Sequence, residues 1–145
     1  MITDPAHTTL ILQRKDDTYP VRRYRGALAC FGGQVEPGES PSAAVRREIT
    51  EEIIDRPLAG AVLTALRPVA RIVTASGHHV SVYAAVLPDF AGHAARIRAL
   101  PQHQVCAEGH LEILCRRTLA GQPFAWNADA LLCAYLRSAT EQDPW

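Results

Sequence analysis

The sequence predicts an α/β fold in which β-strands stand on both sides of a helix that carries three carboxylates. Two observations predict it: β-rich runs precede and follow a helical segment at 41–53, and a second helix is expected near the end of the chain. With 145 residues and an ordinary globular composition, the chain suits one domain with one hydrophobic core. We therefore expect a single domain over residues 1–145.

Strands are expected where β-branched and apolar residues gather between turn residues. Before the central helix, we expect a strand at 8–13 and one or two short strands within 21–30. After it, strands are expected at 61–66, 70–74, 80–87 and 105–114, the last of these interrupted by Gly109. A turn at Ser76-Gly77 should join two of these strands and leave His78-His79 exposed at its tip.

The C-terminal third is less regular. Residues 94–100 suit a short helix or an irregular connector, because Pro88 and Pro101 interrupt the chain on either side. Asn127 is expected to cap a closing helix. The apolar face of that helix is formed by Leu131, Leu132, Tyr135 and Leu136. Residues 139–145 are expected to form a frayed tail.

The central helix has a clear start and one apolar face. Ser40 can accept hydrogen bonds from the free amides of the first turn, and Pro41 is tolerated at the first helical position. At helical spacing, an apolar stripe is formed by Val45, Ile49 and Ile53. Arg56-Pro57 is expected to end the segment.

Three carboxylates, Glu48, Glu51 and Glu52, occupy the arc beside this stripe, because residues three and four apart are neighbours on a helix. Like charges so placed destabilise an isolated helix by about a few tenths of a kcal/mol per pair. A bound divalent cation would reverse that interaction, and Mg²⁺ prefers oxygen ligands that it shares with substrate phosphates. We therefore interpret the three as candidate ligands and catalytic groups for Mg²⁺ or Mn²⁺.

A glycine pair, Gly32-Gly33, precedes this helix. Without side chains, the backbone there can approach a metal or a phosphate closely and can adopt positive φ. The pair therefore suits the other half of a phosphate site.

These residues stand at a fixed spacing. Gly33 is followed after five residues by Glu39, and after seven more by Arg47-Glu48-Ile49-Thr50-Glu51-Glu52. This order resembles the box that defines the Nudix hydrolases (MutT-like proteins), a family that cleaves nucleoside diphosphates linked to some other moiety. The box occupies residues 33–55.

Three positions depart from the family pattern. Ile54 stands where the family has Gly, Asp55 where it has an apolar residue, and Phe31 where members often carry Pro. All three lie outside the metal-binding positions. They concern the end of the box helix and the shape of the loop before it.

The resemblance implies an α/β/α sandwich with a mixed β-sheet. It also implies that a carbonyl near Gly33 joins the three carboxylates as a metal ligand, and that Glu39 and Arg47 form a structural pair. The general base in this family is either a box glutamate, here Glu48 or Glu52, or a residue of a later loop. Glu108 is the candidate outside the box, and Glu112 is a weaker one.

The expected function is Mg²⁺-dependent hydrolysis of a diphosphate linkage in a nucleoside diphosphate derivative, as in a nucleotide or nucleotide-sugar pyrophosphatase. The alternative is a catalytically silent Nudix-fold protein that binds a ligand or regulates. An isomerase-like relative would need a Cys and further acids that we do not find. A regulator on this fold would normally carry an added DNA-binding domain, for which this chain has no room.

The substrate is less well specified. The signatures of the ADP-ribose, dinucleoside polyphosphate and coenzyme A groups are absent from the sequence. Arg23 and Arg25, which precede the glycine pair, are possible ligands of a phosphate or a second acidic group, and Phe31 and Glu108 are further candidates. An aromatic platform for a base is available from residues such as Tyr19, Tyr24, Tyr83, Phe124 and Trp126.

Composition and charge limit the classes of molecule that this chain is expected to bind. The formal net charge is zero, which gives no bulk attraction to nucleic acid or to an anionic membrane. No signal pattern and no bilayer-long apolar run is found, so we expect a cytoplasmic protein that acts on a small-molecule nucleotide, with a homodimer left open. The four cysteines are scattered and predict neither a zinc site nor a disulfide framework.

Overall fold

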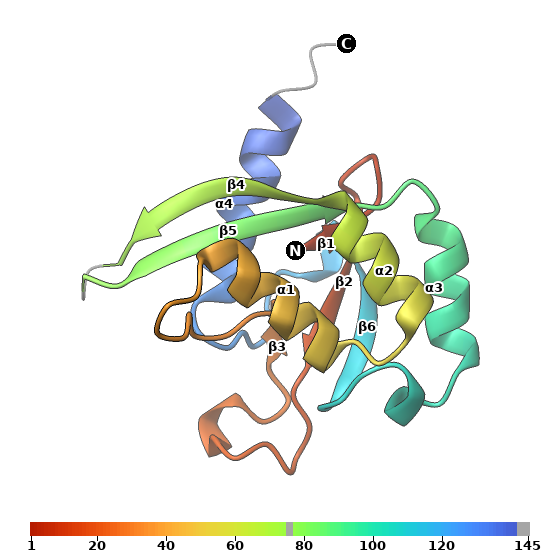
Figure 1. Ribbon diagram of the computed structural model, residues 1–145. Coiled ribbons are helices and arrows are strands. Elements are labelled where there is room, and N and C mark those ends of the chain that lie inside the picture. The colour runs from red at the N-terminus through yellow and green to blue at the C-terminus, as the bar shows by residue number, and fades with distance from the viewer. Residues whose placement is uncertain (75–76, 142–145) are drawn as a thin grey trace.

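The structure, a computed structural model, describes residues 1–74 and 77–141 (Figure 1). Within these ranges the chain forms a six-stranded mixed sheet and four α-helices. The strands are β1 (Ile2–Thr3), β2 (Thr9–Arg14), β3 (Leu28–Ala29), β4 (Leu66–Val73), β5 (His79–Val86) and β6 (His110–Cys115). The helices are α1 (Pro41–Glu52), α2 (Arg56–Ala65), α3 (Phe90–Ala99) and α4 (Ala128–Glu141). Short 3₁₀ turns occupy Arg22–Tyr24, Gln102–Gln104 and Arg116–Thr118.

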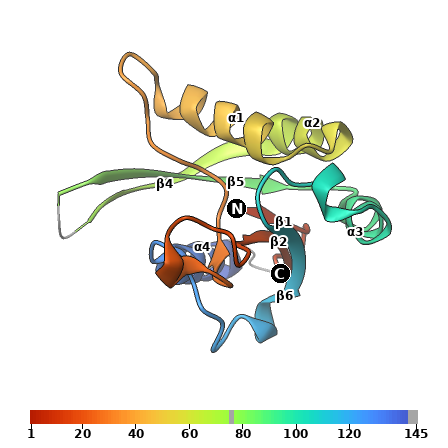
Figure 2. The ribbon, with the colours of Figure 1, turned by 90° about the horizontal axis from the view of Figure 1, so that it is seen from below.

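The elements form three layers, which confirms the expected α/β/α sandwich. Helices α1 and α2 cover one face of the sheet, with α3 beside them, and α4 covers the other face (Figure 2). Successive side chains of β2 point to opposite faces of the sheet and so contribute to both cores. Ile11 packs in the core with α1, α2 and α3, whereas Leu10 and Leu12 pack against α4. The apolar stripe of α1 reaches the first core through Ile49 and Ile53, which are buried.

The sheet divides in its middle because β1 is only two residues long. The strand order is β3-β2-β1-β5-β4, with β6 along the other edge of β2. β1 runs parallel to β5 and antiparallel to β2, pairing Ile2 with both Ala85 and Ile11. Further along, β2 pairs with β3 instead, at Gln13 and Arg14. The first half of β5 therefore separates from β3, and the space between them becomes part of the site.

One expected strand is wrong. Residues 61–66 lie mostly in α2, which begins where Asp55 accepts a hydrogen bond from the Leu58 amide at 3.1 Å. Pro57 occupies the first turn of that helix, so Arg56-Pro57 starts a helix after α1 has ended. A short apolar run has no clear period, which is why it can be mistaken for a strand.

Other boundaries differ by less. Only β3 forms within 21–30, preceded by a 3₁₀ turn, and β6 begins after Gly109 at His110. The connector at 94–100 is helical, since α3 spans Phe90–Ala99. His78 and His79 are exposed as expected, while Ser76 lies outside the described residues. α4 includes the first three residues of the expected tail, and 142–145 lie outside the described residues.

No described helix has both the length and the apolar character needed to cross a bilayer.

Candidate active site

A cleft of about 990 Å³ opens where the sheet divides. One wall is the glycine loop together with α1, and the opposite wall is the first half of β5, from His79 to Tyr83. The end of the cleft is formed by Lys15 and Tyr19, by Ala107 and Glu108, and by residues that lead into α4. Segments from the whole length of the chain thus meet at one cavity.

Helix α1 brings the three box glutamates to this cleft. Ser40 caps the helix by accepting from the Ala43 amide at 3.1 Å, as the sequence predicts. Ile49 anchors the neighbouring arc of the helix in the core. All three predicted carboxylates, Glu48, Glu51 and Glu52, line the cavity. Their side chains differ in exposure, since Glu51 is 59% exposed and Glu52 only 14%.

The glycine loop lies directly against these carboxylates. The Gly32 amide donates a hydrogen bond to Oε2 of Glu52 at 3.1 Å. A Cβ placed on Gly33 would collide with the carboxylate of Glu48, so no larger residue fits there without movement. Gly32 has a φ of 140°, a conformation that other residues rarely adopt. Both glycines are therefore required by geometry.

Arg47 ties the loop to the helix. Its guanidinium donates to both carboxylate oxygens of Glu39, at 3.2 and 3.1 Å, and to the carbonyl of Gln34 at 3.1 Å. It also contacts Glu48 at 2.8 Å and Glu51 at 3.3 Å. Hydrogen bonds from Arg47 lower the pKa of Glu39. Glu39 and Arg47 are thus hydrogen-bonded to each other as part of a larger network.

Glu52 has the strongest electrostatic perturbation among the carboxylates of the cleft. Burial raises its pKa to about 7, and the charges of Glu48 and Glu108 act in the same direction. The ammonium of Lys15 and the amide of Gly32 oppose that rise. A carboxyl group in this state can exchange a proton near neutral pH.

Lys15 is a site residue that sequence reasoning missed. Its ammonium lies 3.2 Å from Glu108 and 3.9 Å from Glu52, and its side chain is only 4% exposed. The available signals were weak: Lys15 is the only lysine of the chain, and it continues the alternation from Ile11 through Gln13. Neither signal indicates that Lys15 contacts Glu52 and Glu108, because these two residues come from distant segments of the chain.

Backbone hydrogen bonds fix Glu108 relative to α1. The Ala107 amide donates to the Glu52 carbonyl at 2.9 Å, and Ile53 forms an isolated antiparallel bridge with Cys106. Glu108 therefore lies at the cleft beside the end of the box helix. Glu112 instead pairs with Arg14, at 2.7 Å from Nη2, which lowers the pKa of Glu112.

The structure does not bring the predicted arginines to the cleft. Arg23 lies 4.9 Å from the ring centre of Tyr24, and Arg25 donates to the carbonyl of Tyr19 at 2.9 Å. Both are exposed, and neither belongs to the described lining of the cavity. Phe31 does line the cleft, although most of its ring is buried in the core.

Comparison with known proteins identifies the family to which this chain belongs. A sequence model described as the NUDIX domain matches residues 1–97. The chain belongs to the Nudix family. Among solved structures it is similar to a Nudix hydrolase from M. smegmatis, RenU, with a TM-score of 0.50 and 17% identity over 99% of this chain and 83% of that one. No curated protein sequence matches the chain.

Membership of the Nudix family confirms the resemblance read from the box, and with it the assignment of the chain as a pyrophosphohydrolase. Nudix hydrolases act on nucleoside diphosphate derivatives in general, and they generally use divalent metal ions. The matched range, 1–97, contains the glycine loop and α1 but ends before Glu108. Part of the cleft therefore lies beyond the family match.

The Nudix box residues fit a divalent ion by their chemistry. Within 1–74 and 77–141, no three His, Cys, Asp or Glu side chains are gathered as a metal ion would require. Arg47 holds Glu48 and Glu51, while Glu52 turns to the Gly32 amide. The donor set is nevertheless of hard carboxylate oxygens on one helical arc, against a loop that has no room for a Cβ at Gly33.

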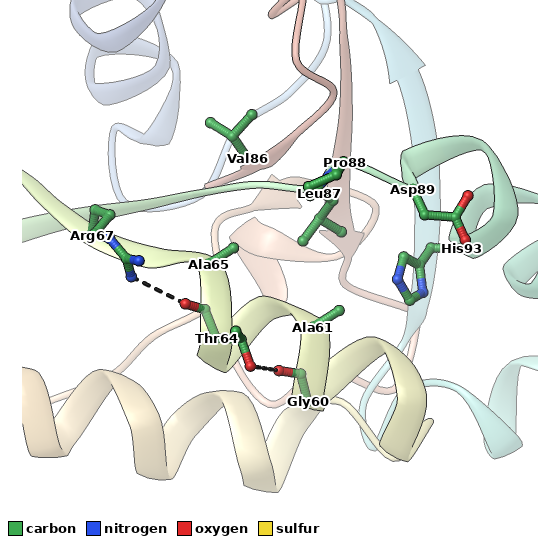
Figure 3. A pocket seen from close by; sticks show the side chains of 10 residues that line it. All are labelled: Gly60, Ala61, Thr64, Ala65, Arg67, Val86, Leu87, Pro88, Asp89 and His93. Carbon is green, nitrogen blue, oxygen red and sulfur yellow. Dashed lines mark hydrogen bonds between the residues drawn. The ribbon is translucent and has the colours of Figure 1, made fainter.

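A second hollow of about 600 Å³ lies between α2 and the segment that joins β5 to α3 (Figure 3). Its polar groups largely satisfy one another: Arg67 donates to the Thr64 carbonyl, and the Thr64 hydroxyl donates to the Gly60 carbonyl. None of the box glutamates lines it. The box glutamates line the larger cleft instead.

Proposed function

We propose that this protein is a Mg²⁺-dependent hydrolase of a diphosphate linkage in a nucleoside diphosphate derivative, in the class of nucleotide or nucleotide-sugar pyrophosphatases. One observation supports this most directly. The three box glutamates line the same cleft as the glycine loop, and two of them lie against that loop, Glu52 at Gly32 and Glu48 at Gly33.

The proposed ligands of Mg²⁺ or Mn²⁺ are Glu48, Glu51 and Glu52, together with the carbonyl of Gly33. When bound, such an ion neutralises charge on diphosphate oxygens and lowers the pKa of water. Arg47 and Glu39 hold the loop at a fixed distance from α1, which keeps both halves of the phosphate site in register.

The proton of the attacking water is proposed to go to a carboxylate beside Lys15. The water oxygen forms a bond to one phosphorus, the bridging P–O bond breaks, and the carboxylate takes the proton. The candidates in the box are Glu48 and Glu52, and Glu52 lies 3.9 Å from the Lys15 ammonium. Glu108 is the candidate outside the box, and Lys15 lies between Glu52 and Glu108.

The test is product release from a panel of nucleoside diphosphate derivatives with Mg²⁺. We expect Glu51→Gln and Glu52→Gln to lower kcat by about 10²-fold or more, as loss of a general base or a metal ligand does. Glu108→Gln then tests the other candidate base, since only a base should flatten the pH profile of kcat. Glu36→Gln is the matched control, because Glu36 lies in the same loop region but outside the described cleft lining.

Two results would contradict the proposal. Full turnover in both Glu51→Gln and Glu52→Gln would remove the box carboxylates from the chemistry. Tight nucleotide binding with no turnover on any substrate or metal would favour the catalytically silent alternative.

A further inference from the structure

We infer that Trp126 is the nucleobase platform of this cleft, and that it selects substrates that carry a planar base. The inference rests on the proposed function, because it assigns the nucleoside end of the same substrate. It is carried by the exposure, backbone conformation and contacts of Trp126, and by the position of Lys15.

Trp126 presents a large apolar ring to the cleft. Half of its surface is exposed, 49%, and the residue lines the same cavity as the three box glutamates. An indole usually contributes most when its apolar surface is buried. An exposed indole inside a concave site is therefore suited to a ligand that covers it.

The backbone holds Trp126 in a strained conformation. Its φ is 52°, and that of the next residue, Asn127, is 56°, both in the left-handed region. For a bulky residue this region is unfavourable, and such outliers persist only where the surroundings hold them and often mark functional sites. Among the Phe, Tyr and Trp residues that the structure describes, only Trp126 has a positive φ.

Hydrogen bonds to β3 hold this segment in place. The Ala125 amide donates to the Leu28 carbonyl at 2.9 Å, and the Leu28 amide donates to the Pro123 carbonyl at 2.8 Å. After Ala29, β3 leads within a few residues to Gly32 and Gly33 of the phosphate site. The indole is therefore fixed relative to the glycine loop through a short stretch of backbone.

Two tyrosines hold the indole ring. Tyr24 packs against it in a tilted arrangement with ring centres 4.8 Å apart, and Tyr19 meets it edge-on at 5.9 Å. A ring already held by such contacts loses little freedom when a ligand binds. Trp126 is thus a preorganised surface.

The distance from the indole to the box suits one nucleoside. The Lys15 ammonium lies 5.6 Å from the centre of the Trp126 ring and 3.9 Å from a Glu52 oxygen. The ring therefore cannot be further from that carboxylate than these two distances combined. A ribose joins a base to its first phosphate over a comparable span.

Local charge favours a base over an anionic group at this end. Lys15 is already shared between Glu52 and Glu108, and Glu48 lies close enough to act on Glu52. At this end of the cleft two carboxylates share one ammonium, because Arg47 is engaged with Glu39, Glu48 and Glu51. A second acidic group would be repelled there. A neutral planar base is not repelled, and its face can stack on the indole.

Fluorescence tests the binding step without requiring turnover. The chain has two tryptophans, so Trp145→Phe leaves Trp126 as the only indole. We expect GMP, AMP, CMP or UMP to quench its emission saturably, and ribose 5-phosphate and glucose 1-phosphate to leave it unchanged at equal concentration. Quenching by the sugar phosphates as strong as by the nucleotides, or no response to any nucleotide, would overturn the inference.

Kinetics test the same residue during turnover. Trp126→Ala should raise KM for nucleoside diphosphate substrates by about fivefold to hundredfold, and should lower kcat much less. Trp126→Phe should restore most of the affinity, because a phenyl ring still stacks, and Trp145→Phe should behave as wild type. An unchanged KM in Trp126→Ala would overturn the inference. If the alanine variant does not fold, Trp126→Leu, which also lacks an aromatic face, replaces it, and an unchanged KM there would have the same meaning.

The two experiments separate this inference from the proposed function. If no substrate is hydrolysed, the proposed function fails and the fluorescence titration still decides whether Trp126 binds a base. If hydrolysis is found but Trp126 does not respond, only the base platform fails.

Discussion

Glu52 is held in a buried position that disfavours its own charge. Its pKa is raised to about 7, mainly by burial, from an ordinary value of 4.5. A carboxyl whose pKa is higher in the folded than in the unfolded chain favours folding at low pH. That contribution is lost as pH rises between about 4.5 and 7, because the folded state must then hold a buried anion.

Glu52→Gln removes this titration and keeps the shape of the side chain. With a chelator present, we expect the variant to exceed the wild type in unfolding free energy by about 2 kcal/mol at pH 8, and to match it near pH 4. Urea denaturation at the two pH values measures the difference. A variant less stable than the wild type at pH 8 would show that Lys15 and the Gly32 amide outweigh the burial of the charge.

Gly33 and Gly60 provide a matched pair of residues for the same substitution. Gly33→Ala places a methyl group against Glu48, so we expect a loss of about 1–2 kcal/mol in stability and at least tenfold in kcat/KM. Gly60 lies in α2 with open space around it, and Gly60→Ala should stabilise the protein by about 0.5–1 kcal/mol. Thermal denaturation and steady-state assays on both variants check this. Equal effects at the two sites would mean that the contact with Glu48 is unimportant.

At the scale of elements, Asp55 explains one departure from the Nudix box. Its carboxylate caps α2 at the Leu58 amide and also receives Arg96 of α3 at 2.7 Å. Its side chain is 4% exposed, so the pair lies in a site with little solvent on the carboxylate side. Where the family has an apolar residue, this chain therefore has a polar junction between two helices.

Asp55→Ala should destabilise the protein by about 2–3 kcal/mol, since it removes both a helix cap and a largely buried ionic contact. Arg96→Ala alone should also destabilise it, because the buried carboxylate loses its cation. Chemical denaturation of the two single variants and the double variant measures the coupling between them. Additive effects would indicate that the ion pair contributes nothing beyond the cap.

The same elements show what sequence could predict. The start of α1 at Ser40 and its anchoring by Ile49 follow from capping chemistry and period, and both are found. Residues 61–66 form a short apolar run that sequence alone does not distinguish from a strand. Asp55, a mismatch to the box pattern, is the N-cap of α2. Gly109, expected to interrupt a strand, has a φ of 62° and lies so close to the Arg14 carbonyl that a Cβ would collide.

The site was predictable only where its residues are close in sequence. The box glutamates and Gly33 share one short segment, and they line one cleft. The contact of Lys15 with Glu108 depends on the register of β2 against β6, in which Arg14 faces His110. Such a register is set by the packing of the whole sheet, so it cannot be predicted from one sequence alone.

At the scale of the whole molecule, metal binding and folding should be coupled. An ion that binds only the native protein raises its stability by about 2.7 kcal/mol at a concentration one hundred times its Kd. We expect Mg²⁺ to raise the melting temperature in a concentration-dependent way, and more at pH 8 than at pH 5, where Glu52 is protonated. Glu51→Gln and Glu52→Gln should weaken the shift, and Glu36→Gln should keep it. An identical shift in all variants would place the ion elsewhere.

The main-chain contacts between the end of α1 and residues 105–107 also bear on how such a protein can diverge. Amides and carbonyls make this connection, so it survives replacement of many of the side chains along it. Mutation at position 108 can then change the chemical group offered to the cleft without moving the backbone that presents it. Position 108 can therefore change its side chain during evolution while the box helix stays aligned with the cleft.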